Sequence, residues 1–335
     1  MIRIVGKRIV QLVLVLFGVS LLVFVMLRVL SPDPASIVLG QQATEQAKEE
    51  WRNANGLNQS ISKQYMEFAL GALGGDFGKS YYTKAPVWEE IKPRFAATFE
   101  LTFLATILAC LSGIGIGTLC AIKKNQLPDY IGRIVSLSGV CVPIFFMGIL
   151  LSLFFGNFLH ILPSSGRIDP LLKPESITGF VLLDCLIEGN IDGFADAVKH
   201  IILPVITLAM YSMAVIARVM RANMLETMEK DFILTARAKG IPEWKVIWNH
   251  GVRNSILPVI TVIGVQFGIL LGGAVLTEEV FAWPGIGSYM VEAVLKSDFP
   301  AIQAVVLLFA VTFVVTNTIV DLLYVWLDPR ITLSN

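Results

Sequence analysis

The side chains that most often bind metals or act as nucleophiles are few and scattered in this sequence. The three histidines are His160, His200 and His250, and none of the four cysteines belongs to a Cys-x-x-Cys pair. Zinc and redox sites need such residues close together. The cysteines instead fit small apolar packing positions. We therefore predict no catalytic residue, no metal site and no cofactor bound by this chain.

Glycine-rich phosphate loops are also missing. No Gly-x-x-x-x-Gly-Lys-Ser/Thr string occurs, so the chain is not expected to bind ATP itself. Gly113, Gly115 and Gly117 have a Gly-x-Gly spacing, but they lie inside an apolar run without a lysine. Close helix packing explains these glycines better. Gly272 and Gly273 are interpreted in the same way.

The most informative stretch is residues 231–245, Asp-Phe-Ile-Leu-Thr-Ala-Arg-Ala-Lys-Gly-Ile-Pro-Glu-Trp-Lys. Residues 224–239 contain neither proline nor glycine and are compatible with a helix. Gly240 suits a helix end with positive φ, and Pro242 suits the start of a second short helix. Alanines would let a partner pack closely, and the cations could pair with an acidic groove. The alternative is an ordinary basic loop that only fixes membrane orientation.

The composition indicates a membrane protein. Of the 335 residues, 55% are hydrophobic and only 16% are charged, and the mean hydropathy is +0.71. A soluble domain has about 25% charged residues. The formal net charge is +0, so no overall field favours nucleic acid as a partner. The main surroundings of this chain should be the lipid bilayer.

Six apolar segments are long enough, or nearly so, to cross a bilayer as helices. They are residues 9–30, 99–122, 134–156, 201–220, 255–277 and 304–327. The apolar segment 177–187 is too short to cross, and the polar segment 44–55 is compatible with a short helix. The predicted fold is therefore an all-α membrane protein with six transmembrane helices.

Lysine and arginine residues predict the orientation, because they concentrate in short cytoplasmic segments. With the N-terminus inside, the inside segments are 1–8, 123–133, 218–253 and 328–335, and these are richer in cations than the outside segments 31–98, 157–200 and 278–303. Six crossings then place both the N- and the C-terminus in the cytoplasm.

Several motifs in order carry a family resemblance. The string Thr-Ala-Arg-Ala-Lys-Gly at 235–240 resembles the coupling loop of bacterial binding-protein-dependent ABC importer permeases, in the peptide and nickel branch. The glutamate that opens this loop in many members is replaced by Leu234, and Arg253 stands where many have a proline. Further similar strings are Pro32-Asp33-Pro34, Gly75-Asp76-Phe77-Gly78, Leu162-Pro163-Ser164-Ser165-Gly166, Phe281-Ala282-Trp283-Pro284-Gly285 and Asp328-Pro329-Arg330. Within the branch, segment 167–204 is most similar to the B-type subunits of dipeptide permeases.

The resemblance implies a type I ABC importer transmembrane fold in the bacterial cytoplasmic (inner) membrane. It implies a second, homologous permease subunit, two ATP-binding subunits that hold ATP and magnesium, and an extracytoplasmic solute-binding protein. It also implies a division into residues 1–93, an N-terminal membrane helix with a large periplasmic loop, and residues 94–335, a core of five helices with a cytoplasmic coupling loop near 231–245. The residues assigned to coupling are Thr235, Ala236, Arg237, Ala238, Lys239 and Gly240, with Pro242 and Glu243 shaping the turn.

Three charged residues near the outer ends of predicted spans are candidates for the pathway or for docking. Arg28 could bind solute, or its long side chain could simply reach the membrane surface. Glu278 and Glu279 could contact solute or the binding protein, or anchor the helix end at the interface.

Other functional classes remain as alternatives. A stand-alone secondary transporter needs charges near the bilayer centre, and the central spans here are almost uncharged. An intramembrane enzyme needs a catalytic pair within the membrane, which the sequence does not offer. Within the importer class, the expected substrates are dipeptides or small peptides, with nickel, glutathione or longer oligopeptides as alternatives.

Overall fold

The computed structural model describes residues 2–29 and 32–327, and over this range the chain is helical, with no strand. The C-terminal residues 328–335, which carry the Asp328-Pro329-Arg330 motif and one predicted cytoplasmic end, lie outside the described residues. The helices are α1 (Ile2–Val29), α2 (Pro34–Val38), α3 (Glu45–Ala54), α4 (Ile61–Leu73), α5 (Val87–Ile122), α6 (Leu127–Cys141), α7 (Ile144–Leu151), η1 (Ser152–Phe158), α8 (Val181–Glu188), α9 (Ile191–Met228), α10 (Asp231–Ala238), α11 (Glu243–Lys245), η2 (Val246–Val252), α12 (Arg253–Gly273), α13 (Val275–Val280), α14 (Ile286–Leu295) and α15 (Phe299–Leu327), where η marks a π-helical segment.

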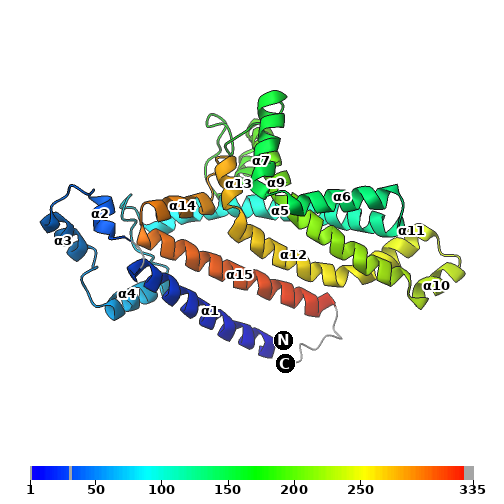
Figure 1. Ribbon diagram of the computed structural model, residues 1–335, viewed down its shortest axis with the longest axis horizontal. Coiled ribbons are helices and arrows are strands. Elements are labelled where there is room, and N and C mark those ends of the chain that lie inside the picture. Colours follow the sequence, from blue (N-terminus) through cyan, green and yellow to red (C-terminus); the bar gives the residue numbers. More distant parts are fainter. Residues whose placement is uncertain (1, 30–31, 328–335) are drawn as a thin grey trace. The chain divides into compact units, whose positions relative to one another are not determined.

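Five helical runs among the described residues are long and apolar enough to cross a membrane, and a bent helix pair makes up to six. The five are α1, α5, α9, the run from α11 to α12, and α15 (Figure 1). Helices α5 and α9 contain 36 and 38 residues. At 1.5 Å per residue each is more than about 50 Å long, whereas a hydrocarbon core is about 30 Å thick. Both therefore extend beyond the membrane-crossing length.

The third predicted span is not one continuous helix. Residues 134–156 were expected to form a single crossing, but the chain breaks between α6 and α7, and the two helical axes differ by 106°. The reason is local. Val142 is extended (φ −86°, ψ 126°), as expected for a residue before proline, and Pro143 has no N–H to continue the helix.

The chain divides into two compact units, Met1–Thr98 with Pro284–Val314, and Phe99–Trp283 with Val315–Asn335. In the first unit, a cluster of buried side chains joins α1, α14 and the start of α15. Its members include Leu27, Ile91, Ile286, Phe299 and Ile302. Asp298 accepts hydrogen bonds from the Ser80 hydroxyl and the Tyr81 amide, so the turn before α15 is tied to the segment before α5.

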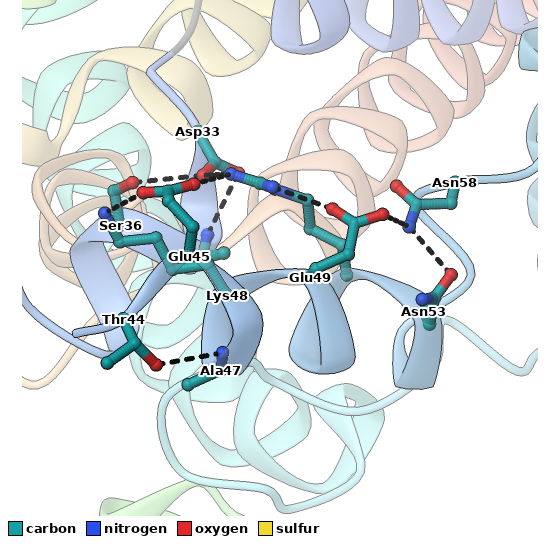
Figure 2. Close-up of polar contacts among 11 residues, drawn as sticks. Asp33, Ser36, Thr44, Glu45, Ala47, Lys48, Glu49, Asn53 and Asn58 are labelled. Carbon is teal, nitrogen blue, oxygen red and sulfur yellow. Dashed lines mark hydrogen bonds and ion pairs between the residues drawn. The ribbon is translucent and has the colours of Figure 1, made fainter.

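The segment between α1 and α5 contains short helices held by polar contacts. Asp33 caps α2, and Thr44 caps α3 as the helix prediction for residues 44–55 requires. Figure 2 shows Asp33 beside the polar side chains of α3, among them Glu49. Arg52 of α3 donates to both carboxylates, at 2.7 Å to Asp33 Oδ2 and 3.0 Å to Glu49 Oε2. Most side-chain hydrogen bonds of this segment therefore join two residues of the segment itself.

The second unit is built around α9, which packs against α6, α7, α8 and α12 (Figure 1). Glycines allow a very close approach between α5 and α9. A Cβ on Gly113 would lie 2.8 Å from the Ile216 side chain, and one on Gly117 would lie 2.6 Å from the Ala217 carbonyl oxygen. The packing role predicted for these two positions is confirmed. A Cβ on Gly115, Gly272 or Gly273 would meet no atom of the described residues within 4 Å, so the predicted close packing is not found at these three positions within this chain.

Candidate functional site

The segment between α9 and α12 folds as two short helices around a glycine turn. Helix α10 ends at Ala238, and Gly240, two residues further on, has a φ of +72°. The Gly240 amide donates to the Arg237 carbonyl at 2.9 Å, and the Ile241 amide donates to the Ala236 carbonyl at 3.3 Å. This pair of bonds is the Schellman arrangement, which needs a left-handed residue at the glycine position. The expected helix over 224–239 is interrupted at Glu229–Lys230, and Pro242 caps α11.

A small apolar cluster supports this turn. Ile233, Ala236 and Val246 are buried, and Met228 and Ile241 pack against them. Ala236, one of the residues assigned to coupling, therefore belongs to the interior of the loop. Its neighbours Thr235, Ala238 and Lys239 are exposed. The loop has a folded core of its own, although it is only about twenty residues long.

Some of the charged side chains of the loop pair with one another. Arg237 donates to both carboxylate oxygens of Glu243, at 3.2 Å from Nε and 2.6 Å from Nη2. The hydrogen bond to Glu243 raises the pKa of the Arg237 guanidinium above its usual value. This pair crosses the glycine turn and ties α10 to α11. Lys245 lies over the Trp244 ring at 5.4 Å, whereas Lys239 is exposed.

Large apolar side chains point away from this core. Leu234 is 57% exposed and Trp244 is 62% exposed, and Phe232 and Trp248 are also exposed. Exposed apolar side chains on a folded loop, next to cations, are typical of a surface that binds another protein.

The end of the loop and the start of α12 pack against the C-terminal end of α9. Gly251 lies so close to α9 that a Cβ on it would be 2.4 Å from the Met224 methyl group. Ser255 contacts Thr227 at 2.9 Å between the hydroxyl oxygens. These close, buried contacts fix the loop to both α9 and α12.

A buried ion pair joins α6 to the same region of α9. Arg221 donates to both oxygens of Asp129, at 2.8 Å from Nε and 2.9 Å from Nη2, and the Asn125 amide adds a bond of 3.0 Å. The Asp129 side chain is fully buried. Sequence reasoning missed this pair, because its members are 92 residues apart and no local pattern connects them.

A second buried pair lies in the segment between η1 and α9. Arg167 bonds Glu100 at 2.5 Å and the Gly179 carbonyl at 2.9 Å, and its guanidinium carbon is 5.6 Å from the centre of the Trp283 ring. The Leu182 amide donates to the other Glu100 oxygen at 3.0 Å. These contacts fasten the 167–182 segment to α5, and the sequence offered no signal for them.

The three outer candidates have different surroundings. Arg28 lies between the rings of Phe24 and Phe299, 5.2 and 5.1 Å from their centres, and its Nε and Nη1 have no hydrogen-bond partner among the described residues. Glu278 is fully buried, whereas Glu279 is exposed. Arg28 belongs to the first compact unit and both glutamates to the second.

The loop forms a folded projection that is anchored to α9 and has an apolar and basic exterior. No group of three histidine, cysteine, aspartate or glutamate side chains in the described part of the chain could hold a metal ion.

Comparison with protein families gives two matches that together cover almost the whole chain. Residues 113–333 match the family described as "Binding-protein-dependent transport system inner membrane component". Residues 1–102 match "Binding-prot-dependent transport system membrane comp, N-term".

Curated relatives are similar over nearly their full length. A probable D,D-dipeptide transport system permease protein of Escherichia coli is 41% identical over 96% of this chain and 94% of the relative. A dipeptide transport system permease protein of Alkalihalophilus pseudofirmus is 41% identical over 97% and 98%. A glutathione transport system permease protein of Escherichia coli is 37% identical over 99% of both chains.

Proposed function

Because the chain belongs to the family of inner-membrane components of binding-protein-dependent transport systems, we propose that it forms half of the translocation pathway of an ATP-driven importer for dipeptides or other small peptides. The chain is a multi-pass permease subunit in the bacterial cytoplasmic (inner) membrane. The other half of the pathway would be a second, homologous permease subunit. An extracytoplasmic solute-binding protein would deliver the peptide.

The orientation proposed here places both termini and the 229–252 loop in the cytoplasm, because the lysine and arginine residues concentrate in those segments. Residues 1–93 then supply a membrane helix and a periplasmic segment, and residues 94–335 supply the core of five helices. The polar network around Asp33 and Arg52 is suited to an aqueous compartment, which supports this division.

Coupling is assigned to the loop 231–245. One observation carries this assignment: a Schellman turn at Gly240 fixes α10 against α11 and leaves Leu234 and Trp244 exposed. Two separate ATP-binding subunits would hold ATP and magnesium, and a groove on each permease-facing surface would receive such a loop. Thr235, Ala238 and Lys239 would face that groove, Ala236, Arg237 and Glu243 would keep the loop rigid, and Pro242 would set the start of α11.

Nucleotide-dependent movement of the ATPases would push this loop and shift the pathway between outward-open and inward-open states. Such a shift requires only that the two states differ in their contacts with the ATPases. The permease itself performs no chemical step in this scheme.

The substrate assignment rests on the relatives. Several of them are named for dipeptide transport, and one for glutathione, itself a short peptide. Nickel and longer oligopeptides are the other substrates considered. Arg28, with unpaired guanidinium N–H groups, is a candidate for the pathway or for docking of the binding protein. Exposed Glu279 is the better placed of the two glutamates for the same role, because Glu278 is buried.

The test is uptake of a labelled dipeptide by cells with and without the gene, with unlabelled dipeptide, tripeptide, glutathione and nickel as competitors. Loss of dipeptide uptake on deletion, restored by the wild-type gene, would support the proposal. If only nickel or glutathione uptake were lost, the chain would still be an importer subunit, but its substrate would be nickel or glutathione. Purification of the chain without any ATP-binding subunit would contradict the coupling role.

A further inference from the structure

A cavity of about 500 Å³ lies between α5, α6 and α9, close to the ion pair of Asp129 and Arg221. Its walls combine two kinds of side chain. Apolar groups come from Ile116, Leu137 and Ala217, and three guanidinium groups come from Arg133, Arg218 and Arg221. Cavities of this size are in the range that binds small ligands, roughly 300–1,000 Å³. Three arginines around one apolar cavity are unusual between membrane helices.

The charges in this cavity are not balanced. Asp129 is the carboxylate that neutralises them, with both oxygens bonded to Arg221 and one also 3.4 Å from Arg133 Nε. Its second oxygen also accepts from the Asn125 amide, so little of its capacity remains. Arg218 is exposed and makes no ion pair or hydrogen bond within the described residues. Three positive groups therefore share one negative group, which leaves an excess of two.

The exposed side chains next to the cavity are apolar, as expected for helix faces that contact lipid. The neighbouring face of α6 exposes Ile131, Ile134 and Leu137, and α5 exposes Leu119. All four lie in candidate membrane-crossing helices. The turn between α5 and α6, at residues 123–126, is cytoplasmic in the orientation proposed above. The arginines thus lie about one to three helical turns inside the cytoplasmic ends of their helices, close to the depth of lipid headgroups.

We propose that this cavity binds an anionic phospholipid of the cytoplasmic leaflet, with its phosphate on Arg218 and Arg133 and its acyl chains along Leu137 and Ile134. Guanidinium groups bind phosphate oxygens with paired hydrogen bonds. Basic pockets between membrane helices on the cytoplasmic side are suited to anionic headgroups. A free phosphate would satisfy the charges but would leave the apolar walls uncovered, so the lipid fits both parts of the site.

The position of the site gives the lipid a structural consequence. Arg221 contributes both to the cavity and to the ion pair that joins α6 to α9, and α9 leads directly into the loop at 231–245. A bound phosphate would add a contact between the same two helices. The proposal rests on the orientation assigned above, but lipid binding can be measured whether or not the substrate assignment is right.

The test uses the purified full-length chain and native mass spectrometry, with phosphatidylglycerol, phosphatidylcholine and inorganic phosphate as separate probes. Phosphatidylglycerol should bind at least tenfold more tightly than phosphatidylcholine. Arg218→Gln and Arg133→Gln should each weaken its binding about fivefold, as expected for one basic residue near an anionic lipid. Arg218→Lys should retain part of the affinity, and Arg253→Gln, an exposed arginine outside the cavity, should have no effect.

Equal binding of the two lipids, or equal binding by wild type and both glutamine variants, would overturn the proposal. Tight binding of inorganic phosphate that is lost in Arg218→Gln, without preference for phosphatidylglycerol, would identify a soluble phosphate site instead. A disulfide between a cysteine placed at Leu137 and the second permease subunit, formed in high yield in membranes, would show that a protein helix fills the cavity.

Discussion

Two segments fold into small structures that are held together differently. Residues 32–86 lie between two candidate spans, and residues 229–252 lead from the end of α9 into the start of the run from α11 to α12. The first depends on charges and amides, with Arg52 bonded to both Asp33 and Glu49. The second depends on a buried apolar cluster around Ile233 and Val246 and on a glycine turn. Most side-chain hydrogen bonds of the first segment join residues within it, although Ser80 and Tyr81 also bond Asp298. The second places its remaining apolar side chains on the outside, as a surface for a partner would require.

The largest effect should come from the glycine turn. Gly240→Val should reduce peptide uptake more than tenfold while the protein still inserts in the membrane, because a β-branched residue resists a φ of +72°. A left-handed conformation costs an ordinary residue about 1–2 kcal/mol. A Cβ at Gly240 would meet no atom of the described residues within 4 Å, so any loss is expected to come from the backbone and not from a clash.

Gly240→Asn is the matched control, since asparagine tolerates the left-handed region. It should keep most of the uptake of the wild type. Equal uptake by the valine and asparagine variants, at equal expression, would remove the turn from the coupling assignment.

A smaller effect is expected from the exposed apolar surface. Trp244→Glu should weaken co-purification with the ATP-binding subunits several-fold, because it places a charge where an apolar contact is expected and Trp244 is 62% exposed. Leu171→Glu is the control, because Leu171 is 93% exposed and lies outside this loop. Normal recovery of the ATPases with Trp244→Glu would show that another surface binds them.

The polar segment should respond to acid. The hydrogen bond from Arg52 holds the pKa of Asp33 below its usual value. The ionised Asp33 therefore stabilises the folded segment fully above the pKa of an unfolded aspartate, about 3.9. This stabilisation is lost as the pH falls through the lower pKa that Asp33 has in the folded protein. In that pH range, the rate of amide hydrogen exchange in residues 32–60 should increase relative to the rate expected from the pH alone.

In the Asp33→Asn variant, the amides of residues 32–60 should exchange faster at neutral pH, and the increase on acidification should be absent. Glu67→Gln, in the same segment but bonded only weakly to Lys63 at 4.0 Å, should behave like the wild type. If the exchange rate of the Asp33→Asn variant still increased on acidification, the acid response would belong to another carboxylate.

The smallest effect should come from the ion pair within the coupling loop. Arg237 and Glu243 are 39% and 56% exposed. Exposed pairs contribute about 0.2–1 kcal/mol. A double-mutant cycle with Arg237→Gln and Glu243→Gln, read from the rate of proteolysis of the loop, should therefore give a coupling of at most a few-fold. A much larger coupling would mean that the pair, and not the apolar cluster, holds the loop together.

The sequence predicted features that depend on neighbouring residues. The turn at Gly240, the start of α11 after Pro242 and the cap of α3 by Thr44 are all set within a few positions along the chain. Pro143 is also a local signal, and the prediction of one continuous span over residues 134–156 did not include it.

Contacts between distant residues could not be predicted in this way. Asp129 and Arg221 lie 92 positions apart, and Glu100 and Arg167 lie 67 apart. Each residue alone looks like an ordinary charge near a helix end. Only the packing of α5, α6 and α9 brings the partners together, and one sequence carries no information about that packing.

The ion pair at Arg221 divides α9 into two very unequal arms. The arm towards the coupling loop, from Arg221 to Met228, is about 10 Å long, and the arm to Ile191 is about 45 Å long. If α9 turns as a rigid rod about that clamp, the displacement at its far end is about four times the displacement at the loop. A movement of about 1 Å at the ATPase would then become about 4 Å at the other end of the helix. Pro204 lies in the long arm and is the point at which such a lever can bend.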